Sequence, residues 1–259
     1  MLNLDETTNE ILDFIRETVK EAKAKGVIVG LSGGVDSSVT ATLSVQALGN
    51  SKVLGLLMPL EFTPSQDTDD AKELADWLGI RTEYIDIQSI CEAFFAKLNC
   101  KENDPEQRIP MANVRARVRM IILYYYANLN NFLVIGTGDR SEGLIGYFTK
   151  YGDGGVDFEP IAHLYKTQVR GLAKYLGVPE KIANKLSSPQ LYPGHKAKDE
   201  IPLEYMKLDQ ILTALFDDKL SPIQASQKTD TPLELVNQFL SRYNKSKHKR
   251  KTPPMLKDW

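Results

Sequence analysis

The chain has 259 residues, of which 42% are hydrophobic and 25% charged, and 32 basic against 34 acidic residues give a formal net charge of −2. This composition excludes a disordered or collagen-like chain, and it excludes an overall cationic surface that would attract nucleic acid or an anionic membrane. The two cysteines, Cys91 and Cys100, form neither a disulfide framework nor a CxxC pair.

The N-terminal residues and the cysteine usage predict a cytoplasmic protein. Residues 1–10 include Asp5, Glu6 and Glu10 and lack the basic and apolar stretches of a signal peptide. No apolar run approaches the length that spans a membrane, and sparse cysteine is typical of a reducing compartment. We therefore expect partners that are neither membranes nor nucleic acids.

The first half of the chain alternates between helical and strand patterns. Apolar spacing predicts an opening helix over 11–22, which Gly26 ends. Short apolar runs predict strands at 27–31, 53–58 and 132–136, and the alternation places a further strand at 82–86. Helical patterns separate the strands, at 37–48, up to 79, at 90–98 and at 111–129. This alternation predicts an α/β fold, a Rossmann-like parallel sheet flanked by helices.

The last third of the chain has no strand pattern. Helices are predicted over 167–176, 203–216 and 231–243, and residues 187–202 have the proline, glycine and lysine content of a mobile active-site loop. We expect a single domain over 1–259. Its α/β nucleotide-binding core would span 1–165, and a mostly helical part over 166–259 would include the mobile loop at about 187–202.

The most informative segment is 30–38, which follows the first predicted strand and begins a helix. Gly33 and Gly34 let the backbone approach an anion, and nearby serines and the free N–H groups of the helix supply hydrogen bonds. The segment is neither a Walker A motif nor a GxGxxG fingerprint. Asp36 would be repelled by a polyphosphate unless magnesium lay between them. The alternative is a tight turn in which Asp36 and Ser37 only cap the helix.

Two further segments can be interpreted in more than one way. Residues 136–142 follow the strand at 132–136, so Glu142 is expected at the same sheet edge, where it would share the magnesium with Asp36. Arg115 and Arg119 lie four residues apart on one side of a helix, which suits either an anion site or a solvated basic face paired with acids.

Several motifs together resemble known families. Residues 32–38 (SGGVDSS) resemble the pyrophosphate loop of the N-type ATP pyrophosphatases. The order of the other motifs, from about Gly30 to Trp259, is similar to that of the NAD synthetase family; they are NxxARxRM at 113–120, GTGxxSE at 136–142, TKYGDGGxD at 149–157, KTQV at 166–169 and HKR at 248–250.

This resemblance implies residue roles. It implies that ATP is bound by Gly30, Leu31, Ser32, Gly33, Gly34, Val35, Asp36, Ser37, Thr137, Lys166 and Ser188. It implies magnesium ligands at Asp36 and Glu142, catalytic roles for Asp36 and Lys166, and deamido-NAD contacts from Arg117, Lys150, Asp157, His248 and Lys249. A homodimer is implied as well.

The resemblance also implies the reaction. ATP adenylates the carboxylate of deamido-NAD, pyrophosphate leaves, and ammonia displaces AMP to give NAD. Only 29 residues precede Gly30, so we expect free ammonia rather than an attached glutaminase domain as the nitrogen source. The chain departs from the family pattern at Asp139, where relatives often have Asn or Thr, and at 187–189, where relatives often have Pro-Ser-Ala. No role is assigned to the acids of 187–202.

Two alternative functions also fit the sequence. One is another N-type ATP pyrophosphatase, either an amidating enzyme like GMP synthetase or a tRNA-thiolating enzyme; Cys91 and Cys100 lie in an ordinary helical stretch, which disfavours thiolation. The other is a non-catalytic nucleotide-binding module, which would not need both Asp36 and Glu142.

Overall fold

The computed structural model describes residues 2–101, 104–185, 191–194 and 200–256. Its four strands are all parallel and form one sheet in the order β3-β2-β1-β4. They are β1 (Gly26–Gly30), β2 (Val53–Leu57), β3 (Arg81–Tyr84) and β4 (Phe132–Val134). The predicted α/β fold with a parallel sheet is confirmed.

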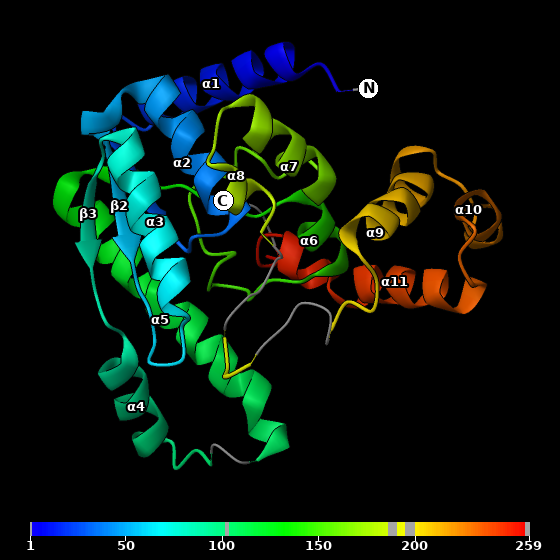
Figure 1. The fold of residues 1–259 in the computed structure, drawn as a ribbon. Coiled ribbons are helices and arrows are strands. Elements are labelled where there is room, and N and C mark those ends of the chain that lie inside the picture. Colours follow the sequence, from blue (N-terminus) through cyan, green and yellow to red (C-terminus); the bar gives the residue numbers. More distant parts are fainter. Residues whose placement is uncertain (1, 102–103, 186–190, 195–199, 257–259) are drawn as a thin grey trace.

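Helices cover both faces of the sheet (Figure 1). Alternate residues of β1 point to opposite sides: Val27 and Val29 belong to one apolar cluster, and Ile28 belongs to the other. The first cluster is completed by α1 (Leu4–Glu21), α2 (Val35–Leu48), α3 (Ser65–Leu78), α7 (Lys166–Tyr175) and α8 (Glu180–Ala183). The second is completed by α4 (Gln88–Lys97) and α5 (Pro105–Asn130). Burial on both faces explains why β1 and β2 are almost wholly apolar.

A third apolar cluster joins the C-terminal helices, which gather beside α6 in Figure 1. Its helices are α6 (Arg140–Ile145), α9 (Tyr205–Leu212), α10 (Pro222–Thr229) and α11 (Leu233–Lys245), with a π-helical turn at Thr213–Asp217. Single 3₁₀ turns lie at Asn50–Lys52 and Lys247–Arg250. The prediction of a helical C-terminal part is therefore confirmed. None of the helices in the described ranges is both long enough and apolar enough to cross a membrane.

The strand order determines where a ligand binds. β2 and β3 lie on one side of β1 and β4 lies on the other, so the connection that leaves β1 and the connection that reaches β4 lead to opposite sides of β1. Parallel sheets bind ligands at this reversal, beyond the carboxyl ends of the strands. The turn after β1 leads into α2, and the turn after β4 leads into α6.

Candidate nucleotide and metal site

The turn between β1 and α2 is shaped by glycine and serine. Gly33 has a φ of 72°, a left-handed conformation that favours glycine. The hydroxyls of Ser32 and Ser37 lie 3.1 Å apart, the Gly34 N–H donates to Ser32 Oγ, and Ser38 Oγ donates to the Gly34 carbonyl. The first-turn N–H groups of α2 have no acceptor within the helix, so the turn offers hydrogen-bond donors and a positive dipole end to an anion.

We predict that Gly33→Ala destabilises the protein by about 1–3 kcal/mol and weakens ATP binding, because an added Cβ would lie 2.2 Å from the Asp67 carbonyl oxygen. Gly171→Ala in α7 is the matched control, since a Cβ there meets nothing within 4 Å and alanine favours a helix. Urea unfolding of both variants tests the prediction; equal stability would show that the turn accommodates a side chain.

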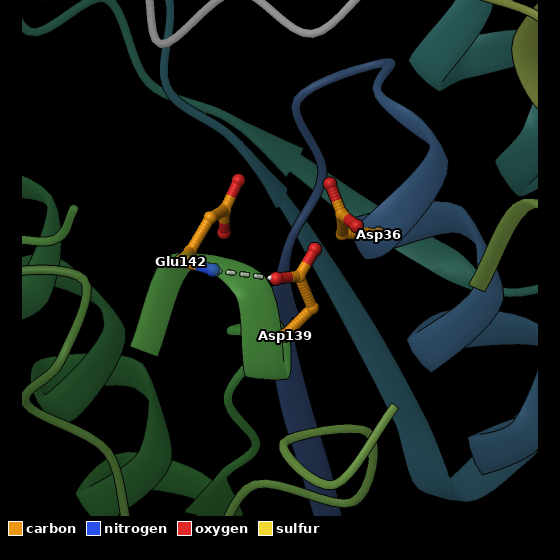
Figure 2. Close-up of side chains that lie close together, drawn as sticks. All are labelled: Asp36, Asp139 and Glu142. Atoms are coloured by element: carbon orange, nitrogen blue, oxygen red, sulfur yellow. Dashed lines mark hydrogen bonds between the residues drawn. The ribbon is translucent and has the colours of Figure 1, made fainter. Parts of the chain in front are cut away.

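Three carboxylates converge between the two turns (Figure 2). Asp36 lies in the first turn of α2, Asp139 caps the N-terminus of α6, and Glu142 lies in the first turn of α6. Each offers an oxygen within 4.8 Å of the others, and the Glu142 N–H donates to Asp139 Oδ1 at 2.8 Å. Burial raises the pKa of Asp139 and of Glu142 above the ordinary carboxyl range, repulsion from Asp36 raises both further, and the charge of Lys166 opposes this shift.

Lys166 lies at the centre of this cluster. Its Nζ is 2.7 Å from Asp36 and 2.8 Å from each of Asp139 and Glu142, and its side chain is 0% exposed. Burial alone would lower the pKa of Lys166, but the three carboxylates raise it well above the ordinary lysine value. The ammonium is therefore charged. The cluster contains three acidic side chains and one basic side chain.

A buried network holds the two helix N-termini that carry these residues. Asp209 of α9 accepts hydrogen bonds from Ser141 Oγ at 2.5 Å and from the Thr167 N–H at 2.9 Å. Ser141 Oγ in turn accepts from the Lys166 N–H. The single carboxylate of Asp209 thus ties α6 to α7 and fixes Glu142 relative to Lys166.

The cluster fits a hard divalent cation. Its donors are all carboxylate oxygens, the ligand type that magnesium prefers. Asp36 Oδ1 is buried and has no hydrogen-bond partner among the described residues, although a buried polar atom is normally paired. This oxygen has lone pairs available for an ion.

A cavity of about 490 Å³ opens in front of the cluster, within the size range of small-molecule sites. The polar part of its lining comes from the turn after β1, from Thr137 and from Glu142. The apolar part comes from Leu56, Met58, Met120 and Leu123. A lining that combines hydrogen-bond donors and acids with apolar side chains suits a nucleotide, which has both phosphates and a base.

The structure brings most of the predicted ATP and metal residues to this cavity. The cavity is lined by Gly30, Leu31, Ser32, Gly34, Val35, Asp36, Thr137 and Glu142. Gly33, Ser37 and Lys166 do not line it, but Ser37 contacts Ser32 and Lys166 contacts Asp36. Ser188 and part of the predicted loop at 187–202 lie outside the described residues.

The predicted deamido-NAD residues do not line that cavity. Arg117 is exposed and donates to the Lys150 carbonyl oxygen at 3.2 Å, so these two residues are neighbours. Asp157 accepts from the Tyr124 hydroxyl and from the Val134 N–H, which ties it to the end of β4. Lys249 donates to the carbonyls of Gly146 and Phe148 and lines a second cavity of about 280 Å³, and His248 is exposed.

The basic side of α5 is not a solvated face. Arg115 is 7% exposed, donates to the Leu191 carbonyl and lies over the ring of Phe95. Arg119 donates to the Met58 carbonyl, and burial lowers its pKa to about 10. Of the two, Arg119 reaches the wall of the larger cavity.

Sequence reasoning missed Asp139, which was noted only as a departure from the family pattern. A signal was present: Asp139 and Glu142 have the three-residue spacing of a helix cap and follow a strand at the ligand-binding edge.

Comparison with known proteins identifies relatives over the full chain. The family model for NAD synthase matches residues 7–253. The NH3-dependent NAD(+) synthetase of Hyperthermus butylicus is 51% identical over 254 residues, covering 98% of this chain and 91% of the relative.

Two solved structures share the fold. The NH3-dependent NAD synthetase of Campylobacter jejuni is 35% identical with a TM-score of 0.82, covering 99% of this chain and 100% of that one. The NMN synthetase of Francisella tularensis is 33% identical with a TM-score of 0.85, covering 98% of this chain and 99% of that one.

Proposed function

The chain belongs to the NAD synthase family, and from this membership we propose that it is a ligase that amidates deamido-NAD to NAD with ammonia and ATP. ATP adenylates the nicotinate carboxylate and releases pyrophosphate, and ammonia then displaces AMP. The observation that carries this proposal is the meeting of a phosphate-binding turn and a three-carboxylate cluster at one wall of a nucleotide-sized cavity. A GMP synthetase-like or tRNA-thiolating enzyme and a non-catalytic module lack comparable support.

The first half-reaction needs the triphosphate held in one orientation. The backbone of 30–37 would bind the phosphates through N–H groups at the N-terminus of α2, with Thr137 beside them on the facing turn. The apolar wall of Leu56, Met58, Met120 and Leu123 would receive the base. Lys166 would neutralise charge that develops as pyrophosphate leaves.

A magnesium ion would be held by Asp36 and Glu142, with Asp139 beside them. When bound, it supplies positive charge that offsets the triphosphate and makes pyrophosphate a better leaving group. The carboxylates would hold that charge next to the N-terminus of α2, where the phosphates are bound. Such a contact would remove the repulsion between Asp36 and a polyphosphate.

The dinucleotide acid would be bound by residues outside the larger cavity. Arg117 and Lys150 are adjacent cations suited to its diphosphate, and Lys249 with His248 would approach from the end of the chain. Asp157 would accept a hydrogen bond from a hydroxyl or from the incoming amine. Ser188 is proposed as a further ATP contact from the family pattern alone.

Product analysis tests this function. The purified chain, given ATP, Mg²⁺, ammonium and deamido-NAD, is expected to form NAD, AMP and pyrophosphate in equal amounts. Omission of ammonium should stop NAD formation and leave deamido-NAD-dependent exchange of labelled pyrophosphate into ATP intact. ADP and phosphate as products would reject the adenylation mechanism.

A mononucleotide acid is the second candidate substrate, because the NMN synthetase of F. tularensis shares this fold over almost the whole chain. The relatives at 42–51% identity are named as NAD synthetases, which favours the dinucleotide. We expect kcat/KM for deamido-NAD to exceed that for nicotinic acid mononucleotide by about tenfold or more, since the mononucleotide lacks groups that the site would bind. The reverse order would assign the mononucleotide.

We also propose a cytoplasmic homodimer. Ile121, Tyr125 and Leu129 form an exposed apolar stripe along α5, and Tyr125 and Leu129 are 63% and 68% exposed. A second copy of the chain would bury this stripe. Both cysteines are free thiols, as suits a reducing compartment. Sedimentation equilibrium is expected to give a dimer that Tyr125→Lys dissociates; a wild-type monomer would refute this.

A further inference from the structure

Lys166 and a metal ion need the same three carboxylates, Asp36, Asp139 and Glu142. The Lys166 Nζ already lies 2.7–2.8 Å from one oxygen each of Asp36, Asp139 and Glu142. A magnesium ion would bind such oxygens at about 2.0–2.1 Å. An ammonium at the centre of the cluster therefore excludes an ion from that position, both by its volume and by like charge.

The buried position of Lys166 also separates it from the phosphates. Its side chain is fully buried, whereas Asp36 and Glu142 are 21% and 22% exposed and line the cavity. A triphosphate in the cavity would thus meet the carboxylates before it met the ammonium. The ring of Tyr205 lies 5.1 Å from the Lys166 Nζ and closes the cluster on another side.

The backbone of Lys166, in contrast, is fixed. Its N–H donates to Ser141 Oγ, and the next N–H, that of Thr167, donates to Asp209. Any movement is therefore confined to the side chain, a flexible four-carbon stem. Such a movement would carry the ammonium from the carboxylates toward the phosphates without disturbing α7.

We propose that Lys166 is an internal counter-ion that occupies the metal position until a divalent cation and nucleotide arrive together. The ammonium neutralises part of the charge of three buried carboxylates in the free protein, and the incoming cation displaces it onto the phosphates. Bare metal therefore binds weakly, and the nucleotide supplies the new partner that Lys166 requires. This proposal deepens the proposed function, on which it depends for the identity of the metal ligands.

Mn²⁺ binding without substrates tests the exchange. Lys166→Met keeps an unbranched side chain and removes the charge, so we expect the Mn²⁺ dissociation constant of the free protein, measured by calorimetry, to fall by about tenfold or more. Lys181→Met is the matched control: Lys181 also pairs with two carboxylates, Asp70 and Glu73, but outside the cluster, and its loss should leave Mn²⁺ affinity unchanged. Unchanged or weaker binding in Lys166→Met would overturn the proposal.

A second measurement uses the wild-type chain and does not depend on the variant folding. The ammonium of Lys166 is protected from water, so its protons should exchange slowly with solvent in the metal-free protein and its ¹⁵Nζ resonance should be observable. Mg²⁺ with a non-hydrolysable ATP analogue is expected to shift that signal, whereas Mg²⁺ alone at the same concentration should not. An unchanged signal in the ternary complex would overturn the exchange. Because neither experiment needs deamido-NAD or ammonia, loss of the amidation activity would be a separate result.

Discussion

Lys166→Met is expected to lower kcat for NAD formation by about a thousandfold, with a smaller change in KM for ATP. The variant loses a cation that acts on charge developing in the transition state, and losing one such donor costs about 10²–10³ in rate, more when the donor is charged. The residue lies at the first position of α7, where Ser141 and Asp209 fix its backbone. Its loss should therefore act through the ammonium and leave the placement of α7 unchanged.

Isotope exchange locates the defect of Lys166→Met in the reaction. Exchange of labelled pyrophosphate into ATP, dependent on deamido-NAD, reports the adenylation step alone. It should fall in parallel with NAD formation, because pyrophosphate departs in that step. Normal exchange combined with slow NAD formation would move the role of Lys166 to the attack by ammonia.

Asp36→Ala is expected to lower turnover by about a thousandfold or more while the protein stays folded. The substitution removes a ligand of the proposed magnesium site, and metal stabilisation of a leaving phosphate is worth several kcal/mol, about tenfold in rate for each 1.36 kcal/mol. Lys166 keeps Asp139 and Glu142 as partners. Higher Mg²⁺ concentration should restore little of the rate.

The stability of Asp36→Ala should equal or exceed that of the wild type. Three carboxylates share one ammonium, so loss of one acid relieves repulsion within a buried group. Functional sites commonly carry such an excess of like charge at a cost in stability. Calorimetric melting checks this, with Asp13→Ala, an exposed change in α1, as the control. Near-wild-type turnover of Asp36→Ala would remove its role at the metal.

The strands β1 and β2 and the long helices were predictable because burial imposes a pattern on the sequence, whereas β3 is exposed along its whole length. Val27 to Val29 is apolar at each residue because each face of β1 meets a layer of helices. The start of α1 was predicted seven residues late, at 11 rather than at Leu4, because its first turns bury Thr7 and Thr8 instead of apolar side chains. The start of α5 was predicted at 111, whereas the helix begins at Pro105 and continues through Pro110, a residue type that ordinarily interrupts a helix.

Short helices escaped prediction for a different reason. α6 has six residues and α10 has eight, too few for a repeated apolar pattern. The start of α10 nevertheless carries a signal: Ser221, Pro222 and Gln224 form a capping box with proline at the first turn.

The candidate site was predictable as two turns at one sheet edge, but its charge arrangement was not. Asp36 and Glu142 follow strands that the apolar runs identify, so their meeting follows from parallel topology. Lys166 lies 130 residues from Asp36, and its position between the carboxylates depends on how α7 packs on α2. Periodicity in the sequence carries no information about that contact.

We propose above all that the turn between β1 and α2 binds a triphosphate through a divalent cation held by Asp36 and Glu142. Crystals grown with Mn²⁺ and a non-hydrolysable ATP analogue test it most directly, through the anomalous signal of manganese. We expect one strong peak between those two carboxylates, with the triphosphate against residues 32–37. A nucleotide bound elsewhere, or a manganese peak away from Asp36, would contradict it.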